Sequence, residues 1–117
     1  MNKEFIPYEQ ALEIKELGFD EDCLSTYHEE LHTIIPIYAK YTNQAVIKAP
    51  LYQQAFRWFR EKHNLIYTIE EVWEGDTEYY VVEITTHNRV DDFLQECTYE
   101  EAELACLKKL IEIVKNK

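Results

Sequence analysis

The stretch LIYTIEEVWEGDTEYYVVEITT, residues 65–86, decides the fold, because each of its halves has the pattern of a β-strand. Before the turn sequence Glu-Gly-Asp at 74–76, side chains of 65–70 alternate between two faces, and after it the segment 79–86 is rich in Tyr, Val, Ile and Thr. We expect an antiparallel hairpin with a connection of about three to four residues. A loop at 87–89 and a short third strand at 93–95 are expected to follow.

Helical segments flank these strands. Apolar residues recur at helical spacing in 7–17, in 50–63 and in a segment that starts at Thr98. The last of these is marked most clearly, because Thr98 followed by Glu101 is a capping box.

The first half of the chain holds weaker strand signals. Residues 33–41 favour extended structure, with Pro36 restricting them to an edge strand or a bend. A turn at 42–44 and a returning strand at 45–47 complete the order α-β-β-α-β-β-(β)-α. This order predicts an α+β fold, with one antiparallel sheet and helices packed on one of its faces, in a single acidic domain over 1–117.

Composition limits the partners. The chain has 117 residues, 12 Lys and Arg against 23 Asp and Glu, and a net charge of −11. Nucleic-acid backbones repel such a chain, so we expect no nucleic-acid binding. No apolar run approaches the roughly 20 residues that span a membrane, and the start lacks a signal-peptide pattern, so no membrane association is expected. Three cysteines without a CxxC motif suit a reducing cytoplasm.

The negative charge is concentrated in the second half. Between Glu70 and Glu103 there are twelve acidic residues and a single basic one, Arg89. Such a segment is a solvated face, a surface for a basic partner, or a mimic of nucleic-acid phosphates, and composition does not separate these readings.

Aromatic residues are concentrated between residues 52 and 80. At helical and strand spacing they are typical of a core, and any that stay exposed would mark an interaction patch. The cluster comprises Tyr52, Phe56, Trp58, Phe59, Tyr67, Trp73, Tyr79 and Tyr80.

Residues 28–32 match the zinc motif HExxH. On a helix, His28 and His32 would share one face and hold zinc, with Glu29 as general base. Pro36 and the flanking β-branched residues favour a strand instead, and a strand separates residues four apart by about 13 Å. We therefore expect no metal site, and keep a small zinc hydrolase as an alternative.

No other catalytic or cofactor-binding centre is expected. The chain has two glycines, so glycine-rich phosphate loops are missing from its sequence. Cys106 lies in an apolar helical stretch and reads as a buried small hydrophobe. Cys23 follows three acidic residues, Asp20, Glu21 and Asp22, which raise the pKa of a thiol and make it a poor nucleophile.

Residues 50–116 are similar in layout to the double-stranded-RNA-binding domain. That family carries a lysine-rich motif at the start of its last helix. Here the same place holds Glu100, Glu101 and Glu103, so RNA binding is not expected.

A resemblance lies in FIPYEQAL (5–12), which runs on to ELGFDE (16–21), in APLYQQAFRWFREK (49–62) and in TYEEAELACLKKL (98–110). In these segments the chain resembles a group of small uncharacterised proteins of gut bacteria and their phages or other mobile elements. The resemblance implies a bacterial cytoplasmic or phage-derived setting, and it implies no activity.

The sequence thus favours a non-enzymatic module that binds a protein partner, with a basic surface on that partner. The alternatives are the zinc hydrolase and an acidic mimic that inhibits a nucleic-acid-binding enzyme. The oligomeric state is left open.

Overall fold

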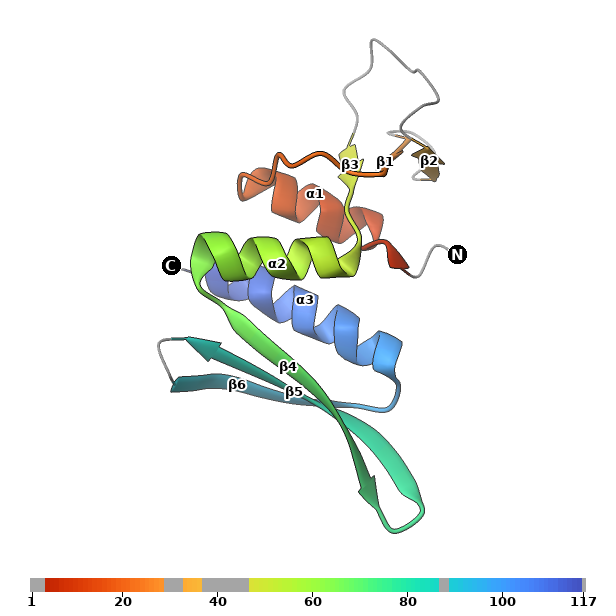
Figure 1. Ribbon diagram of the computed structural model, residues 1–117, viewed down its shortest axis with the longest axis vertical. Helices are drawn as coiled ribbons and strands as arrows, with labels where there is room; N and C mark the ends of the chain where they lie inside the picture. The colour runs from red at the N-terminus through yellow and green to blue at the C-terminus, as the bar shows by residue number, and fades with distance from the viewer. Residues whose placement is uncertain (1–3, 29–32, 37–46, 87–88, 117) are drawn as a thin grey trace. The chain divides into compact units, whose positions relative to one another are not determined.

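The computed structural model describes residues 4–28, 33–36, 47–86 and 89–116. The described residues contain three helices and six strands (Figure 1). In chain order these are α1 (Tyr8–Glu16), β1 (Ser25–Tyr27), β2 (Ile34–Pro36), β3 (Ile47–Ala49), α2 (Tyr52–His63), β4 (Ile66–Glu74), β5 (Thr77–Thr86), β6 (Arg89–Glu96) and α3 (Tyr99–Lys115).

The chain groups into two compact units, residues 1–55 and 56–117, with the boundary inside α2. The α+β class is confirmed, and the order of elements roughly matches the predicted one, with one more strand in the first half. One sheet was expected, whereas the structure has two antiparallel three-stranded sheets, one in each unit. The single domain over 1–117 stays a prediction.

The sheet of the first unit has the strand order β2-β1-β3. Its central strand, Ser25–Tyr27, is buried along its whole length and was missed from sequence, because three residues are too short for an alternating pattern. β2 lies at the edge and ends at Pro36, as proline requires. β3 covers Ile47–Ala49, slightly later than the strand expected at 45–47. The turn expected at 42–44 lies outside the described residues.

Helix α1 ends at Glu16 and is followed, after the C-cap residue Leu17, by a glycine. Gly18 has φ +105°, and its amide donates to the carbonyl of Lys15 while the amide of Phe19 donates to the carbonyl of Ile14. These two bonds form a Schellman motif, in which the first residue after the helix takes a positive φ that glycine tolerates. Pro7 occupies the N-cap position rather than the first helical one.

The sheet of the second unit has the order β4-β5-β6 and supplies the scaffold for the candidate site. β4 and β5 pair from Ile66↔Thr85 to Glu74↔Thr77, so the connection is the two-residue turn Gly75-Asp76, shorter than expected. Gly75 has φ +65°, the conformation that the first position of a type II′ turn requires. β6 is longer than the predicted 93–95, because Arg89 already pairs with Thr86.

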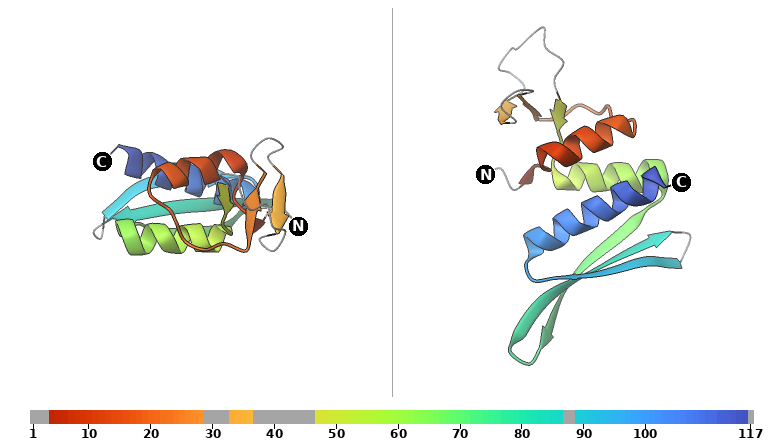
Figure 2. Two further views of the ribbon diagram at one scale, coloured as in Figure 1. Left: turned by 90° about the horizontal axis from the view of Figure 1, so that it is seen from above. Right: turned by 180° about the vertical axis from the view of Figure 1, so that it is seen from behind.

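Helix α3 contacts all three strands of this sheet (Figures 1 and 2). The capping box is confirmed at its start: the Glu101 amide donates to Thr98 Oγ1 over 3.1 Å, and the hydroxyl donates to Glu101 Oε1 over 2.9 Å. Its buried residues are Ala102, Cys106, Leu107, Leu110 and Ile111.

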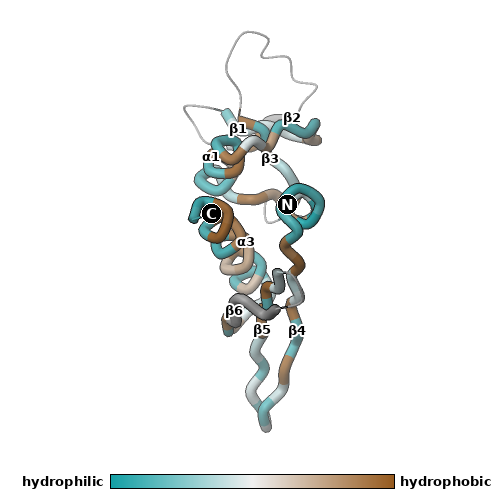
Figure 3. Tube along the Cα trace, turned by 90° about the vertical axis from the view of Figure 1, so that its left-hand side faces the viewer, coloured by the Kyte–Doolittle hydropathy of each residue, from teal (hydrophilic) through white to brown (hydrophobic). Residues whose placement is uncertain are grey.

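The side chains of β4 and β5 alternate between two sheet faces. Val82 and Ile84 are fully buried. Burial also raises the pKa of Tyr67. The charges of three α3 residues, Tyr99, Cys106 and Glu103, add to this increase. These positions therefore lie on the α3-facing side of the sheet. Figure 3 shows that both strands contain hydrophobic and hydrophilic positions.

Candidate functional site

The hairpin of β4 and β5 extends beyond the start of α3 (Figures 1 and 2). There the register places a group of acidic and aromatic side chains on the α3-facing side. In the register Glu71 lies opposite Tyr80, and Trp73 lies opposite Glu78, so all four share one face. Tyr99, the first residue of α3, adds a third ring. We call these five residues the acidic aromatic surface.

Trp73 is the most exposed ring of this surface, with 60% of its area accessible. Its indole Nε1 donates a hydrogen bond of 2.6 Å to Glu71 Oε1, two residues earlier on the same face. Because the N–H lies in the plane of the ring, this bond fixes the indole by its edge and does not use its π-face.

Tyr80 repeats this arrangement on the neighbouring strand. Its hydroxyl donates to Glu78 Oε1 over 2.7 Å. The ring also meets that of Tyr99 edge to face, with centroids 5.8 Å apart, and Tyr99 is itself 45% exposed. The four hairpin side chains thus form a chequerboard in which each ring has a carboxylate along its own strand and another across the ladder.

The carboxylates in and around this surface contribute to raised pKa values of neighbouring groups. The hydrogen bond to Glu78, followed by burial and the charges of Glu78, Glu71 and Glu100, raises the pKa of Tyr80 to about 12. Burial and the charge of Glu100 raise the pKa of Glu103 above its usual value. A negative potential disfavours any further negative charge and favours a bound cation.

Aromatic rings beside carboxylates are suited to binding cations. Lys, Arg and quaternary ammonium groups bind over the faces of Trp and Tyr through the ring quadrupole, and carboxylates accept their hydrogen bonds. An exposed tryptophan is also a typical anchor of protein interfaces.

The remaining carboxylates of β4 and β5 lie on the opposite face. Glu70, Glu74 and Glu83 occupy the alternate positions of the ladder. Acidic side chains of this hairpin therefore flank both faces, and do not form one row on a single face.

The zinc motif is described only in part. His28 follows β1, and its amide donates to the Thr33 carbonyl over 2.7 Å, so it stands at the start of the connection to β2. Glu29 and His32 lie outside the described residues. Among the described residues, no group of three or more His, Cys, Asp or Glu side chains could hold a metal ion. The zinc site stays a prediction.

The two buried cysteines have raised pKa values. Burial is the main cause at Cys23, and with Glu21 and Asp22 it raises the thiol pKa to about 11 although Lys48 opposes it. Burial raises the pKa of Cys106 to about 12. Both thiols stay protonated at neutral pH, in agreement with the sequence interpretation, which had named the carboxylates and not burial as the cause at Cys23.

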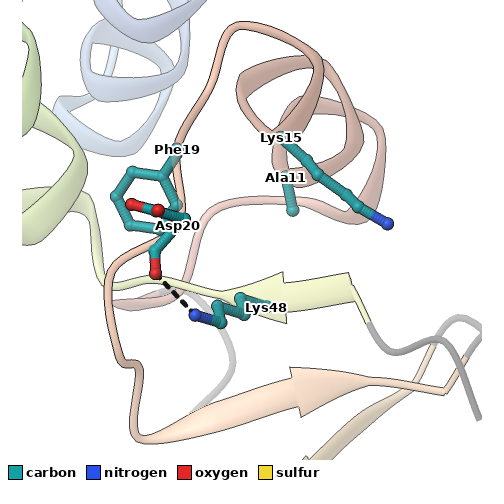
Figure 4. Close-up of a pocket in the computed structure, with 5 residues that line it drawn as sticks. All are labelled: Ala11, Lys15, Phe19, Asp20 and Lys48. Atoms are coloured by element: carbon teal, nitrogen blue, oxygen red, sulfur yellow. Dashed lines mark hydrogen bonds between the residues drawn. The ribbon is translucent and has the colours of Figure 1, made fainter.

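The first unit holds a hollow of about 150 Å³, lined by Ala11, Lys15, Phe19, Asp20 and Lys48 (Figure 4). Lys48 Nζ donates to the backbone carbonyl of Asp20 over 2.7 Å, which holds the segment after α1 against β3. In Figure 4 the Lys48 ammonium points toward Asp20 and that of Lys15 points away from it. The two cations do not converge on one ligand position.

The predicted aromatic cluster is divided between core and surface. Tyr52, Phe56, Trp58 and Phe59 of α2 are buried, and Phe56 contacts Tyr67 with ring centroids 4.3 Å apart. Trp73 is 60% exposed, in line with the expectation that part of the cluster stays outside the core. Tyr99 was not singled out, although its place next to the capping residue Thr98 put it at the exposed start of a helix.

Comparison of the chain with protein-family models, curated proteins and solved structures finds no match. Among the described residues, none of the helices has the length and apolarity needed to cross a membrane. The resemblance to proteins of gut bacteria and phages, and the cytoplasmic location, stay predictions.

Proposed function

We propose that the chain is a non-enzymatic binding module that recognises a basic polypeptide through the acidic aromatic surface. The observation that carries this proposal is the Trp73 ring, which is 60% exposed and held by its edge to Glu71 at the tip of an acidic hairpin. Leaving such a ring in water has no stabilising role in the fold, and it offers a π-face to a cation.

The charge distribution supports a basic partner. No Lys or Arg occurs between residues 63 and 88, a range that includes both strands of the hairpin, whereas the same range carries six acidic residues. These are Glu70, Glu71, Glu74, Asp76, Glu78 and Glu83. A basic chain is steered to such a region by long-range attraction, and exposed rings add short-range contacts.

The other two functions keep weaker support. A mimic of nucleic-acid phosphates needs carboxylates along one contiguous face, whereas those of β4 and β5 alternate between two faces. The zinc hydrolase depends on Glu29 and His32, and both lie outside the described residues. Both stay predictions.

The test is a titration of the full chain with a fluorescent, unstructured peptide rich in Lys and Arg, followed by anisotropy. We expect saturable binding that weakens as salt rises from about 50 to about 500 mM, since screening shortens the reach of exposed charges. Doubly substituting Glu71→Gln and Glu78→Gln should weaken binding about threefold to tenfold, the effect of losing two exposed ion pairs.

The matched control is the double variant Glu16→Gln and Glu61→Gln. Both residues are exposed and lie on α1 and α2, so this variant changes the net charge equally and leaves the hairpin intact. Equal loss of affinity in the two double variants would contradict the assigned site. Absence of binding at low salt would contradict the function.

A further inference from the structure

The free edge of β4 is unusually suited to pairing with another strand. β4 is nine residues long, lies at the edge of its sheet and, among the described residues, pairs with β5 alone. Edge strands are normally protected by shortness, charged side chains, proline or a bulge, and the charges on β4 are all carboxylates, which repel an acidic strand and attract a basic one. The sequence of β4 contains neither Lys nor Pro, and its register with β5 runs unbroken.

The register fixes which backbone groups face outward. In a hairpin with a two-residue turn the flanking residues, Glu74 and Thr77, exchange hydrogen bonds, and along an antiparallel ladder bonded and non-bonded pairs then alternate. Every second residue of β4 therefore directs its N–H and C=O toward the free edge. These residues are Tyr67, Ile69, Glu71 and Trp73.

The same residues place their side chains on the α3-facing side, so the outward backbone groups and the acidic aromatic surface belong to one strip of β4. A strand added to this edge would lie beside Glu71 and Trp73 on one face. On the other face it would lie beside Glu70 and Glu74.

Charge selects the occupant. If a second copy of the chain paired antiparallel along the full length of β4, Glu70 of one copy would face Glu70 of the other, which is destabilising. A strand carrying Lys or Arg would find an acidic neighbour on either face.

We propose that a basic segment of the partner binds in extended conformation as a fourth strand beside β4. This proposal rests on the proposed function and adds the mode of binding. Main-chain hydrogen bonds to the outward groups supply the affinity, and basic side chains beside Glu71 and Glu70 supply the specificity.

The experiment is residue-resolved amide hydrogen exchange of the full chain, with and without a peptide of about ten residues in which pairs of Lys alternate with pairs of Val, so that each face of the bound strand carries Lys. We expect exchange at the amides of Tyr67, Ile69, Glu71 and Trp73 to slow at least tenfold when the peptide is bound. Amides at the intervening positions, such as Thr68 and Glu70, already bond to β5 and should change little.

A second peptide of the same sequence and charge, methylated on every backbone nitrogen, is the control. It keeps the side chains and loses the N–H donors, so we expect it to bind at least tenfold more weakly. Equal binding of both peptides without the alternating protection would overturn strand addition and leave the proposed function standing.

Two other outcomes are also decisive. If neither peptide binds, the proposed function fails together with the mode of binding. Alternating protection that appears without peptide, and grows with protein concentration, would assign the edge to a second copy of the chain and overturn the basic segment as its occupant.

Discussion

The α3-facing side of the β4–β5 hairpin has two halves that share the same strands and ladder but differ in what covers them. The covered half lies under α3 and holds Tyr67, Ile69, Val82 and Ile84. The tip holds Glu71, Trp73, Glu78 and Tyr80.

The two halves differ sharply in exposure. Val82 and Ile84 have no accessible surface, whereas Trp73 is 60% exposed. Both halves belong to one continuous ladder, so membership of a strand face does not by itself indicate the role of a residue. The start of α3 at Tyr99 divides the face into a part that stabilises the fold and a part available for binding.

The largest expected contrast is in stability. Ile84→Ala should lower the free energy of unfolding by about 2–5 kcal/mol, because it leaves a cavity under α3. Trp73→Ala should change it by less than about 1 kcal/mol, since an exposed side chain buries little area. Urea unfolding followed by circular dichroism measures both, and comparable losses would refute the division of the hairpin.

The next expected effect is on the titration of the tip. In the native protein the pKa of Tyr80 is raised to about 12, first by its hydrogen bond to Glu78. Glu78→Gln should return this pKa much of the way to the ordinary value of 10.0. Ultraviolet absorbance of tyrosinate against pH measures the change, with Tyr80→Phe to assign the transition. An unchanged titration curve would mean that the hydrogen bond to Glu78 does not raise the pKa of Tyr80.

The covered half should show its own dependence on pH. Burial raises the pKa of Cys106 from 9.0 to about 12, so the thiol ionises first in the unfolded chain. Its stabilisation is complete below about pH 9 and is lost as the pH rises toward 12. At pH 10 the expected loss is about 1.4 kcal/mol. Urea midpoints at pH 8 and 10 test this, and Cys106→Ala should reduce the loss. The same loss in that variant would exclude Cys106 as its source.

The smallest expected effect is at the boundary between the halves. Thr98→Ala removes the acceptor of the Glu101 amide at the start of α3 and should cost about 1 kcal/mol. Thr98→Ser keeps the hydroxyl and should cost less. The melting temperatures of the two variants provide the comparison. If both variants are destabilised equally, the hydrogen bond to the Thr98 hydroxyl does not stabilise α3.

Much of the second unit was predictable from the sequence, because long strands and capped helices leave periodic patterns. The hairpin over 65–86 and the helix after Thr98 are confirmed. The turn was predicted too long because a Gly at the first position allows a two-residue connection. The first unit was harder, since strands of three residues, such as Ser25–Tyr27, show no period and form through their neighbours.

The sequence predicted which kinds of residue the candidate site contains, but not which of them lie together on the surface. The acidic segment and the surplus of aromatic residues were visible in the sequence, but burial decides which rings stay exposed. Trp58 and Trp73 are both flanked by apolar and charged residues, yet one is 4% and the other 60% exposed. The free edge of β4 depends on the order of strands in the sheet, which local patterns do not contain.

The two tryptophans also provide the most direct test of the binding surface. In a ¹H–¹⁵N spectrum of the labelled chain, the indole signals of Trp58 and Trp73 can be followed while a peptide rich in Lys and Arg is added. We predict that the Trp73 signal shifts and saturates while the Trp58 signal stays in place. A Trp73 signal that does not move under conditions where the peptide binds would contradict the assignment of function to the tip of the hairpin.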